Sequence, residues 1–200
     1  MTITQILPIG KKKSRVLTDE GLAFAVYQTE LSKLRLEEGS VLSPAFLEEE
    51  LFPLLTRRAY SRAIHLLTVR DYSEQDLRRK YEESGIPELC CDRAVSLLKE
   101  HRFLDDRRFA ESYIRSHSEN KSHRQLMAGL MQHGISRDTA DELLADILPD
   151  EEAQIHRLLE KRRYNPDTAD AKEQQRTASF LARKGYGWDV VLRAVRPKNC

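Results

Sequence analysis

YEESGI at residues 81–86 is the stretch that decides the fold, because LMQHGI at 130–135 and LARKGY at 181–186 repeat its pattern. The glycines of these strings, Gly85, Gly134 and Gly185, are 49 and 51 residues apart. In each copy a large apolar or aromatic residue stands four positions before the glycine and another directly after it. Apolar residues also stand six and ten positions after each glycine: Cys91 and Val95, Ala140 and Leu144, Val191 and Val195. The chain therefore repeats a unit of about fifty residues three times.

Each copy predicts three helices, the second of which ends at the repeated glycine. Glycine adopts the positive φ that ends a helix, and the apolar residue after it folds back onto that helix. Apolar residues at helical spacing support this prediction. The predicted helices span 57–70, 73–84 and 87–101, then 105–118, 121–133 and 136–148, then 150–163, 169–184 and 187–196. Because one unit buries little surface alone, we expect the units to stack into an elongated, curved array.

The first 56 residues have a different pattern. Three short apolar stretches, Ile3–Ile9, Ser14–Thr18 and Leu22–Tyr27, alternate with turns and predict a small antiparallel meander. A helix follows from Gln28, and Ser43-Pro44 predicts the start of another that Pro53 breaks or kinks. The fold is thus mainly α, a β-containing N-terminal segment at 1–56 followed by three-helix repeats at 57–103, 104–148 and 149–200.

Composition and charge narrow the class of protein. A chain of 200 residues that is 40% hydrophobic and 32% charged fits a globular protein with one or two modest cores. No apolar run is long enough for a membrane span, and the N-terminal charges follow the apolar stretch instead of preceding it. We therefore expect a cytoplasmic protein that acts as a monomer. The three cysteines lack disulfide or metal-site spacing and are expected to be buried or incidental thiols.

Catalytic motifs are missing from the sequence. LPIGKKKS at 7–14 lacks the spacing of a phosphate-binding loop. The six histidines form no HExxH motif and no cluster with cysteines, and no GxSxG elbow is present. We expect no enzymatic activity, no cofactor and no metal.

Two aromatic motifs have both a structural and a functional interpretation. In FLDDRRFA at 103–110, Phe103 and Leu104 are expected to be buried and an aspartate to cap the next helix, although a paired carboxylate is also compatible with cation binding or acid–base chemistry. Tyr186 and Trp188 are expected in the core, and stacking on a nucleobase is the alternative.

Basic clusters recur in all three repeats. Taken singly, each is typical of a solvated helix face, but their recurrence predicts a basic strip for phosphates or for an acidic protein surface. The net charge of +1 argues against a strong independent DNA binder. The candidate residues are Arg57, Arg58, Arg78, Arg79, Lys80, Arg107, Arg108, Lys121, Arg124, Lys161, Arg162, Arg163, Arg183 and Lys184.

Several of these strings together resemble the RecX family of bacterial regulatory proteins, which are built from tandem three-helix repeats. The matching strings are AIHLL at 63–67, the segment from Ser73 through Leu77 to Gly85, FLDDRRFAESYI at 103–114, GI at 134–135 and FLARKGY at 180–186. The N-terminal segment also resembles the β-containing extension of longer members. Ser122 departs from the pattern, because the resemblance predicts glycine there, and this leaves the start of the second repeat's middle helix open.

The resemblance implies a function. RecX proteins bind the filament that the RecA recombinase forms on single-stranded DNA, lodge in its helical groove, and inhibit ATP hydrolysis, strand exchange and filament growth or persistence. This chain is accordingly expected to act on RecA in recombination, DNA repair and the SOS response, and to contact DNA mainly within the filament. Two alternatives stay open: an autonomous helix-turn-helix DNA-binding protein, and a helical-repeat scaffold for another partner.

Overall fold

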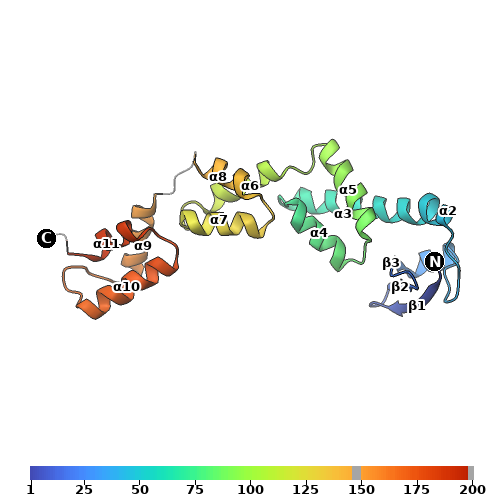
Figure 1. Ribbon diagram of the computed structural model, residues 1–200, viewed down its shortest axis with the longest axis horizontal. Helices are drawn as coiled ribbons and strands as arrows, with labels where there is room; N and C mark the ends of the chain where they lie inside the picture. The colour runs from blue at the N-terminus through green and yellow to red at the C-terminus, as the bar shows by residue number, and fades with distance from the viewer. Residues whose placement is uncertain (146–149, 198–200) are drawn as a thin grey trace. The chain divides into compact units, whose positions relative to one another are not determined.

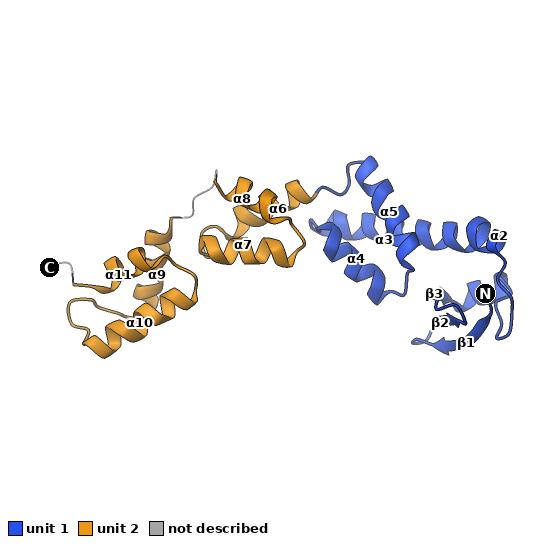
Figure 2. Cartoon of the chain, viewed as in Figure 1, with its two compact units in different colours: residues 1–105 blue, residues 106–200 orange. Residues whose placement is uncertain are grey.

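The computed structural model describes residues 1–145 and 150–197 as two compact units, residues 1–105 and 106–200 (Figure 2). Unit 1 contains the N-terminal segment and the first repeat, and unit 2 contains the second and third repeats. The predicted helix at 136–148 begins in the described part of the chain, but its residues 146–148 lie outside it, as does Cys200.

Unit 1 opens with the predicted meander (Figure 1). Strands β1 (Ile3–Pro8), β2 (Lys13–Thr18) and β3 (Ala23–Tyr27) form an antiparallel sheet in the order β1-β2-β3. Pro8 pairs with Ser14 and Leu17 with Ala23, so short turns join neighbouring strands. The helical elements that follow are α1 (Gln28–Lys33), α2 (Pro44–Phe46), η1 (Leu47–Leu51), α3 (Phe52–Val69), α4 (Glu74–Glu83) and α5 (Glu88–Glu100).

The helix predicted to begin at residue 57 instead begins at Phe52. Pro53 does not end the preceding helix; a π-helical turn, η1, lies directly before it. The helical backbone runs from η1 into α3 without a break, and the wider π turn changes the hydrogen bonding just before the proline, which has no N–H to donate. A boundary between residues 56 and 57 therefore falls inside α3.

The sheet and the first repeat share one hydrophobic core. Ile3, Val16 and Phe24 of the sheet are buried in the same cluster as Leu55 of α3 and Tyr81 of α4. Ala25 N–H also donates to the Gly85 carbonyl at 2.7 Å. The N-terminal segment is thus an integral part of unit 1.

Unit 2 contains two three-helix bundles, each with its own core. Its helices are α6 (Asp106–His117), α7 (His123–Gln132), α8 (Arg137–Ala145), α9 (Glu151–Lys161), α10 (Ala171–Arg183) and α11 (Trp188–Val195). None of the helices in the described ranges is long and apolar enough to cross a membrane.

All twelve repeat-defining apolar positions are buried, as the alignment on the glycines predicts. Gly85, Gly134 and Gly185 have φ of +69°, +83° and +89°, and the residue after each donates its N–H back to the helix that has just ended. The buried residues are Tyr81, Ile86, Cys91, Val95, Leu130, Ile135, Ala140, Leu144, Leu181, Tyr186, Val191 and Val195.

The burial predicted for three pairs of side chains is confirmed for some of them and wrong for others. Leu104 is buried, but Phe103 is 45% exposed, so the prediction for Phe103 was wrong. Tyr186 is buried, whereas Trp188, the first residue of α11, was expected in the core and is 55% exposed. Cys90 and Cys91 are buried thiols as predicted, and burial raises the pKa of Cys91 to about 11.

A polar junction joins the second and third repeats inside unit 2. The Gln154 side chain is buried, donates to the Ser118 carbonyl at 2.5 Å and the Lys121 carbonyl at 3.2 Å, and accepts from the Tyr186 hydroxyl at 3.1 Å. Ser122 is the N-cap of α7, and its hydroxyl also donates to the Lys184 carbonyl at 2.8 Å. Ser122, which stands where the resemblance predicts glycine, is therefore the N-cap of α7 and hydrogen-bonds α7 to the third repeat.

Replacing Ser122 with alanine is expected to lower the free energy of unfolding of unit 2 by about 2 kcal/mol, since it removes a helix cap and leaves a neighbouring carbonyl without its partner. Ser136→Ala is the matched control, because Ser136 accepts from the Thr139 N–H at 3.2 Å and is exposed. We expect the control to cost about 1 kcal/mol. Urea unfolding measures both values, and equal losses would contradict the role of Ser122 between repeats.

Candidate nucleic-acid interface

Most candidate cations of unit 1 are neutralised by carboxylates. Arg58 pairs with Glu30 and lies over the Tyr27 ring. Arg78 bonds Glu74 at 2.7 Å and Asp92 at 2.6 Å. The two remaining pairs are Arg79 with Asp76 and Lys80 with Glu83. The pairs of Arg58 and Arg78 join different elements of unit 1, whereas those of Arg79 and Lys80 lie within α4. Arg57 is exposed.

The cations at the start of the second repeat are also engaged. Arg107 bonds Glu142 at 3.0 Å and lies 3.5 Å from Glu111. Lys121 Nζ donates to the Tyr113 hydroxyl at 2.6 Å and stands over its ring. Arg108 is exposed on α6.

Unit 2 brings five cations together along α10, and the described residues offer none of them a carboxylate partner. We name this set the α10 basic surface. Its members are Arg124, Arg162, Arg176, Arg183 and Lys184.

Two hollows lie along the α10 basic surface and share one lining residue. The first, of about 510 Å³, lies between α7 and the end of α10 and contains Arg124, Arg183 and Lys184. The second, of about 410 Å³, lies beside α9 and α10 and contains Arg162, Arg176 and Arg183. Arg183 lines both hollows, and neither lining includes a carboxylate. The five cations thus form one surface.

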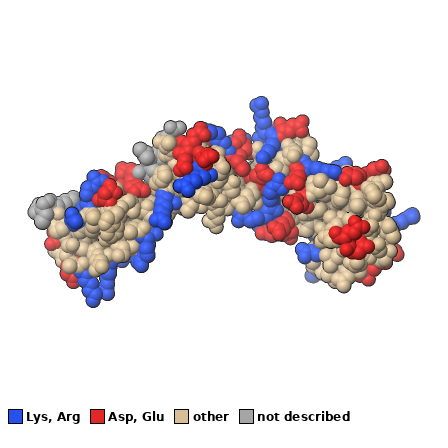
Figure 3. Space-filling model, in the orientation of Figure 1, with Lys and Arg blue, Asp and Glu red and all other residues tan. Residues whose placement is uncertain are grey.

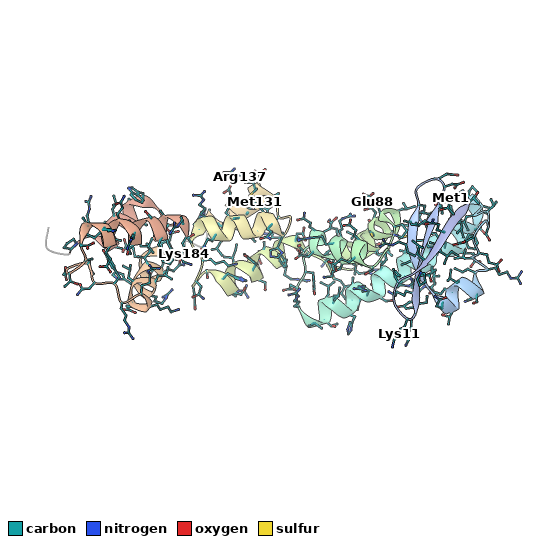
Figure 4. The ribbon with its side chains drawn as sticks, turned by 90° about the horizontal axis from the view of Figure 1, so that it is seen from below. Met1, Lys11, Glu88, Met131, Arg137 and Lys184 are labelled. Carbon is teal, nitrogen blue, oxygen red and sulfur yellow. The ribbon has the colours of Figure 1, made fainter. Side chains whose placement is uncertain are left out.

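Local structure fixes this arrangement. The close approach of Gly185 to α7 places the end of α10 there, since a Cβ on Gly185 would lie 3.0 Å from both the Ser122 hydroxyl and the Arg124 Cβ. Figure 4 labels Lys184 at this meeting of α10 with α7. Arg176 and Arg183 are seven residues apart and share one face of α10.

The Phe180 ring contacts one cation from each hollow. Its ring lies under the Arg162 guanidinium at 4.2 Å and under Lys184 Nζ at 5.4 Å. Such contacts orient cations without neutralising them. In Figure 3, Lys and Arg atoms gather along the α10 side of unit 2, whereas blue and red atoms are interspersed on unit 1.

This arrangement suits polyanion binding. Arginine and lysine side chains donate to phosphate oxygens, and an open row of them follows a sugar–phosphate backbone without reading sequence.

Residues 1–145 and 150–197 contain no group of three histidine, cysteine or acidic side chains placed to hold a metal ion.

The sequence prediction identified this surface only in part. Arg124, Arg162, Arg183 and Lys184 are in it, while Lys161 and Arg163 are exposed but line neither hollow. Arg176 was missed because it stands alone in the sequence. The available signal was its seven-residue spacing from Arg183 on a helix.

Comparison with known proteins identifies the three repeats one by one. Residues 59–98 match the family model for the first three-helix domain of RecX, residues 105–144 the second, and residues 150–195 the third. Together these matches cover more than half of the chain.

Whole-chain relatives agree. The regulatory protein RecX of Bacillus velezensis is 29% identical over 96% of this chain and 76% of its own length. RecX of Neisseria meningitidis is 32% identical over 68% of this chain and 88% of its own. A crystal structure of regulatory protein RecX has the same fold, with a TM-score of 0.62, 23% identity and coverage of 96% of this chain and 98% of that one. The chain belongs to the RecX family of regulatory proteins.

Proposed function

We propose that this protein binds the RecA filament on single-stranded DNA and inhibits its ATPase, strand exchange and persistence, as a regulator of recombination, DNA repair and the SOS response. Membership of the RecX family supports the choice of partner. The observation that carries the mode of binding is the α10 basic surface, whose five cations have no carboxylate partner among the described residues. The protein would act as a cytoplasmic monomer.

The proposed mechanism needs no chemistry from this chain. The α10 basic surface contacts phosphates of the filament's DNA, and the remaining helices bridge neighbouring RecA subunits. Such a bridge would block the groove through which a second DNA enters, and it would hold the subunits in an inactive arrangement or stop addition at the filament end. Weak contact with DNA alone follows from the net charge of +1 and from the ion pairs that neutralise most candidate cations of unit 1.

RecA ATPase on single-stranded DNA tests the proposal. Adding this protein is expected to inhibit ATP hydrolysis at ratios well below one per RecA, because one bound molecule affects several subunits. Strand exchange measured in parallel is expected to fall over the same range. No inhibition of either reaction at saturating protein would reject the proposed function.

The two alternatives predict different results. An autonomous DNA-binding protein would retard duplex DNA tightly and sequence-selectively in a salt-titrated gel shift without RecA. A scaffold for another partner would retain a protein other than RecA in a pull-down from extract. We expect weak, sequence-independent retardation and retention of RecA.

A further inference from the structure

An open apolar groove of about 780 Å³ lies between α3 and α5 of unit 1. Thr56, Arg57 and Tyr60 line it from α3, and Arg93 and Leu97 line it from α5. His101, just beyond α5, also lines it. Two packed helices with a groove between them form the usual receptor for a third, amphipathic helix.

The apolar wall of the groove is already formed. Leu97 is 38% exposed on α5, unlike Ala94 and Leu98 of the same helix, which are buried in the core. The Tyr60 hydroxyl and His101 Nδ1 are hydrogen-bonded at 2.9 Å, and the rings of His101 and Phe103 both meet the Tyr60 ring edge-on. This exposed aromatic cluster is held in place before any partner arrives.

The polar groups of the groove favour an acidic partner. Asp92 is the acidic residue of the lining, and Arg78 neutralises it at 2.6 Å. Arg57 is exposed and has no carboxylate partner among the described residues. The side chain of the groove whose charge has no ion-pair partner in the described chain is therefore a cation, Arg57.

We propose that the α3–α5 groove binds an acidic amphipathic helix of a partner protein. Leucine-sized side chains of that helix pack on Leu97 and Tyr60, and a carboxylate on its edge pairs with Arg57. The proposal goes beyond the proposed function, because it concerns a protein segment bound by unit 1 and makes no use of the α10 basic surface.

Fluorescence anisotropy with the full chain and three labelled helical peptides of about fourteen residues tests the charge and apolar requirements. The first peptide has leucine at positions i, i+3, i+4 and i+7 with glutamate on its flanks. The second has lysine in place of glutamate, and the third has alanine in place of leucine. We expect micromolar binding of the first and binding at least about tenfold weaker for the other two. Equal binding of all three would overturn the proposal.

Variants of the chain locate the site. Leu97→Asp and Arg57→Glu are each expected to weaken binding of the first peptide about tenfold. Val69→Asp is the matched control, because Val69 is 75% exposed at the end of α3 and does not line the groove, and it should leave the affinity unchanged. Melting curves measured by circular dichroism show whether each variant is folded. If Leu97→Asp unfolds the chain, Arg57→Glu still tests the site, because Arg57 is exposed.

A photo-reactive leucine in the first peptide gives an independent readout. Crosslinks are expected on α3 and α5. Crosslinks confined to unit 2, or unchanged affinity in both Leu97→Asp and Arg57→Glu, would reject the groove as the binding site.

Discussion

Reversing three charges of the α10 basic surface, in the variant Arg176→Glu/Arg183→Glu/Lys184→Glu, is expected to raise the concentration that half-inhibits RecA ATPase about a hundredfold. Each lost phosphate contact removes favourable electrostatic energy, and each new carboxylate repels the DNA. No carboxylate lines the two hollows to compensate for the change. ATPase titration at fixed RecA and DNA measures the effect.

The salt dependence of filament binding separates phosphate contact from other causes. For single-stranded DNA, each neutralised phosphate contributes about 0.7 to the slope of log affinity against log salt concentration. Loss of three contacts should therefore reduce the slope by about 2. Anisotropy of a labelled filament, titrated at several salt concentrations, gives this slope for the parent chain and the variant.

A control variant of equal charge keeps the result specific. Arg115→Glu/Arg137→Glu/Lys161→Glu changes the charge of unit 2 by the same amount at exposed residues that line neither hollow. We expect this control to inhibit RecA within a few-fold of the parent chain. If both triple variants lose inhibition equally, net charge and not the α10 basic surface determines binding.

Charge reversal of Arg78, Arg79 and Lys80 has a different expected consequence. Arg78 bridges α4 and α5 through Glu74 and Asp92, and Glu74 also bonds Lys99 at 2.5 Å. Reversal places several carboxylates together, so unit 1 should melt at a lower temperature. The result would report loss of structure in unit 1 and not loss of a phosphate contact.

The repeat architecture was predictable because it depends on local rules. A helix that ends at glycine, an apolar residue that folds back and an inward stripe on the next helix are all visible at fixed spacing in one sequence. Each of the twelve apolar positions aligned on Gly85, Gly134 and Gly185 is buried. The exposure of Phe103 and Trp188 was not predictable from these rules, because it depends on whether a neighbouring element covers a helix terminus.

The basic surface was predictable only in part, for a related reason. Sequence clusters such as Arg78-Arg79-Lys80 place cations side by side, and carboxylates three or four residues away on the same helix pair with them. The second carboxylate that neutralises Arg78 comes from a different helix, which the cluster alone does not reveal. Conversely, Arg176 and Arg124 stand apart in the sequence and meet the Arg183 and Lys184 pair only through helical spacing and the contact of Gly185 with α7. The elongated, curved array of all three repeats stays a prediction.

Replacing Gly85 with alanine is expected to lower the free energy of unfolding of unit 1 by about 3 kcal/mol. Positive φ costs an L-residue about 1–2 kcal/mol. The new Cβ would also lie 2.8 Å from the Ala25 Cβ and 3.4 Å from the Ala25 nitrogen, so β3 must move away from the helix end. That movement weakens the hydrogen bond from Ala25 N–H to the Gly85 carbonyl. Urea unfolding measures the loss, and amide exchange should become faster at Ala25.

Two further variants separate backbone strain from this close contact. Gly39→Ala has the same kind of strain at φ +85° but open space around its Cβ, so it should cost only about 1–2 kcal/mol. Adding Ala25→Gly to Gly85→Ala removes the closest clashing atom and should restore part of the lost stability. If Gly85→Ala and Gly39→Ala cost the same and Ala25→Gly restores nothing, the sheet does not depend on Gly85 for its packing against the first repeat. If Gly85→Ala costs more than Gly39→Ala, as we expect, Gly85 both ends a helix and lets the N-terminal sheet pack against the first repeat.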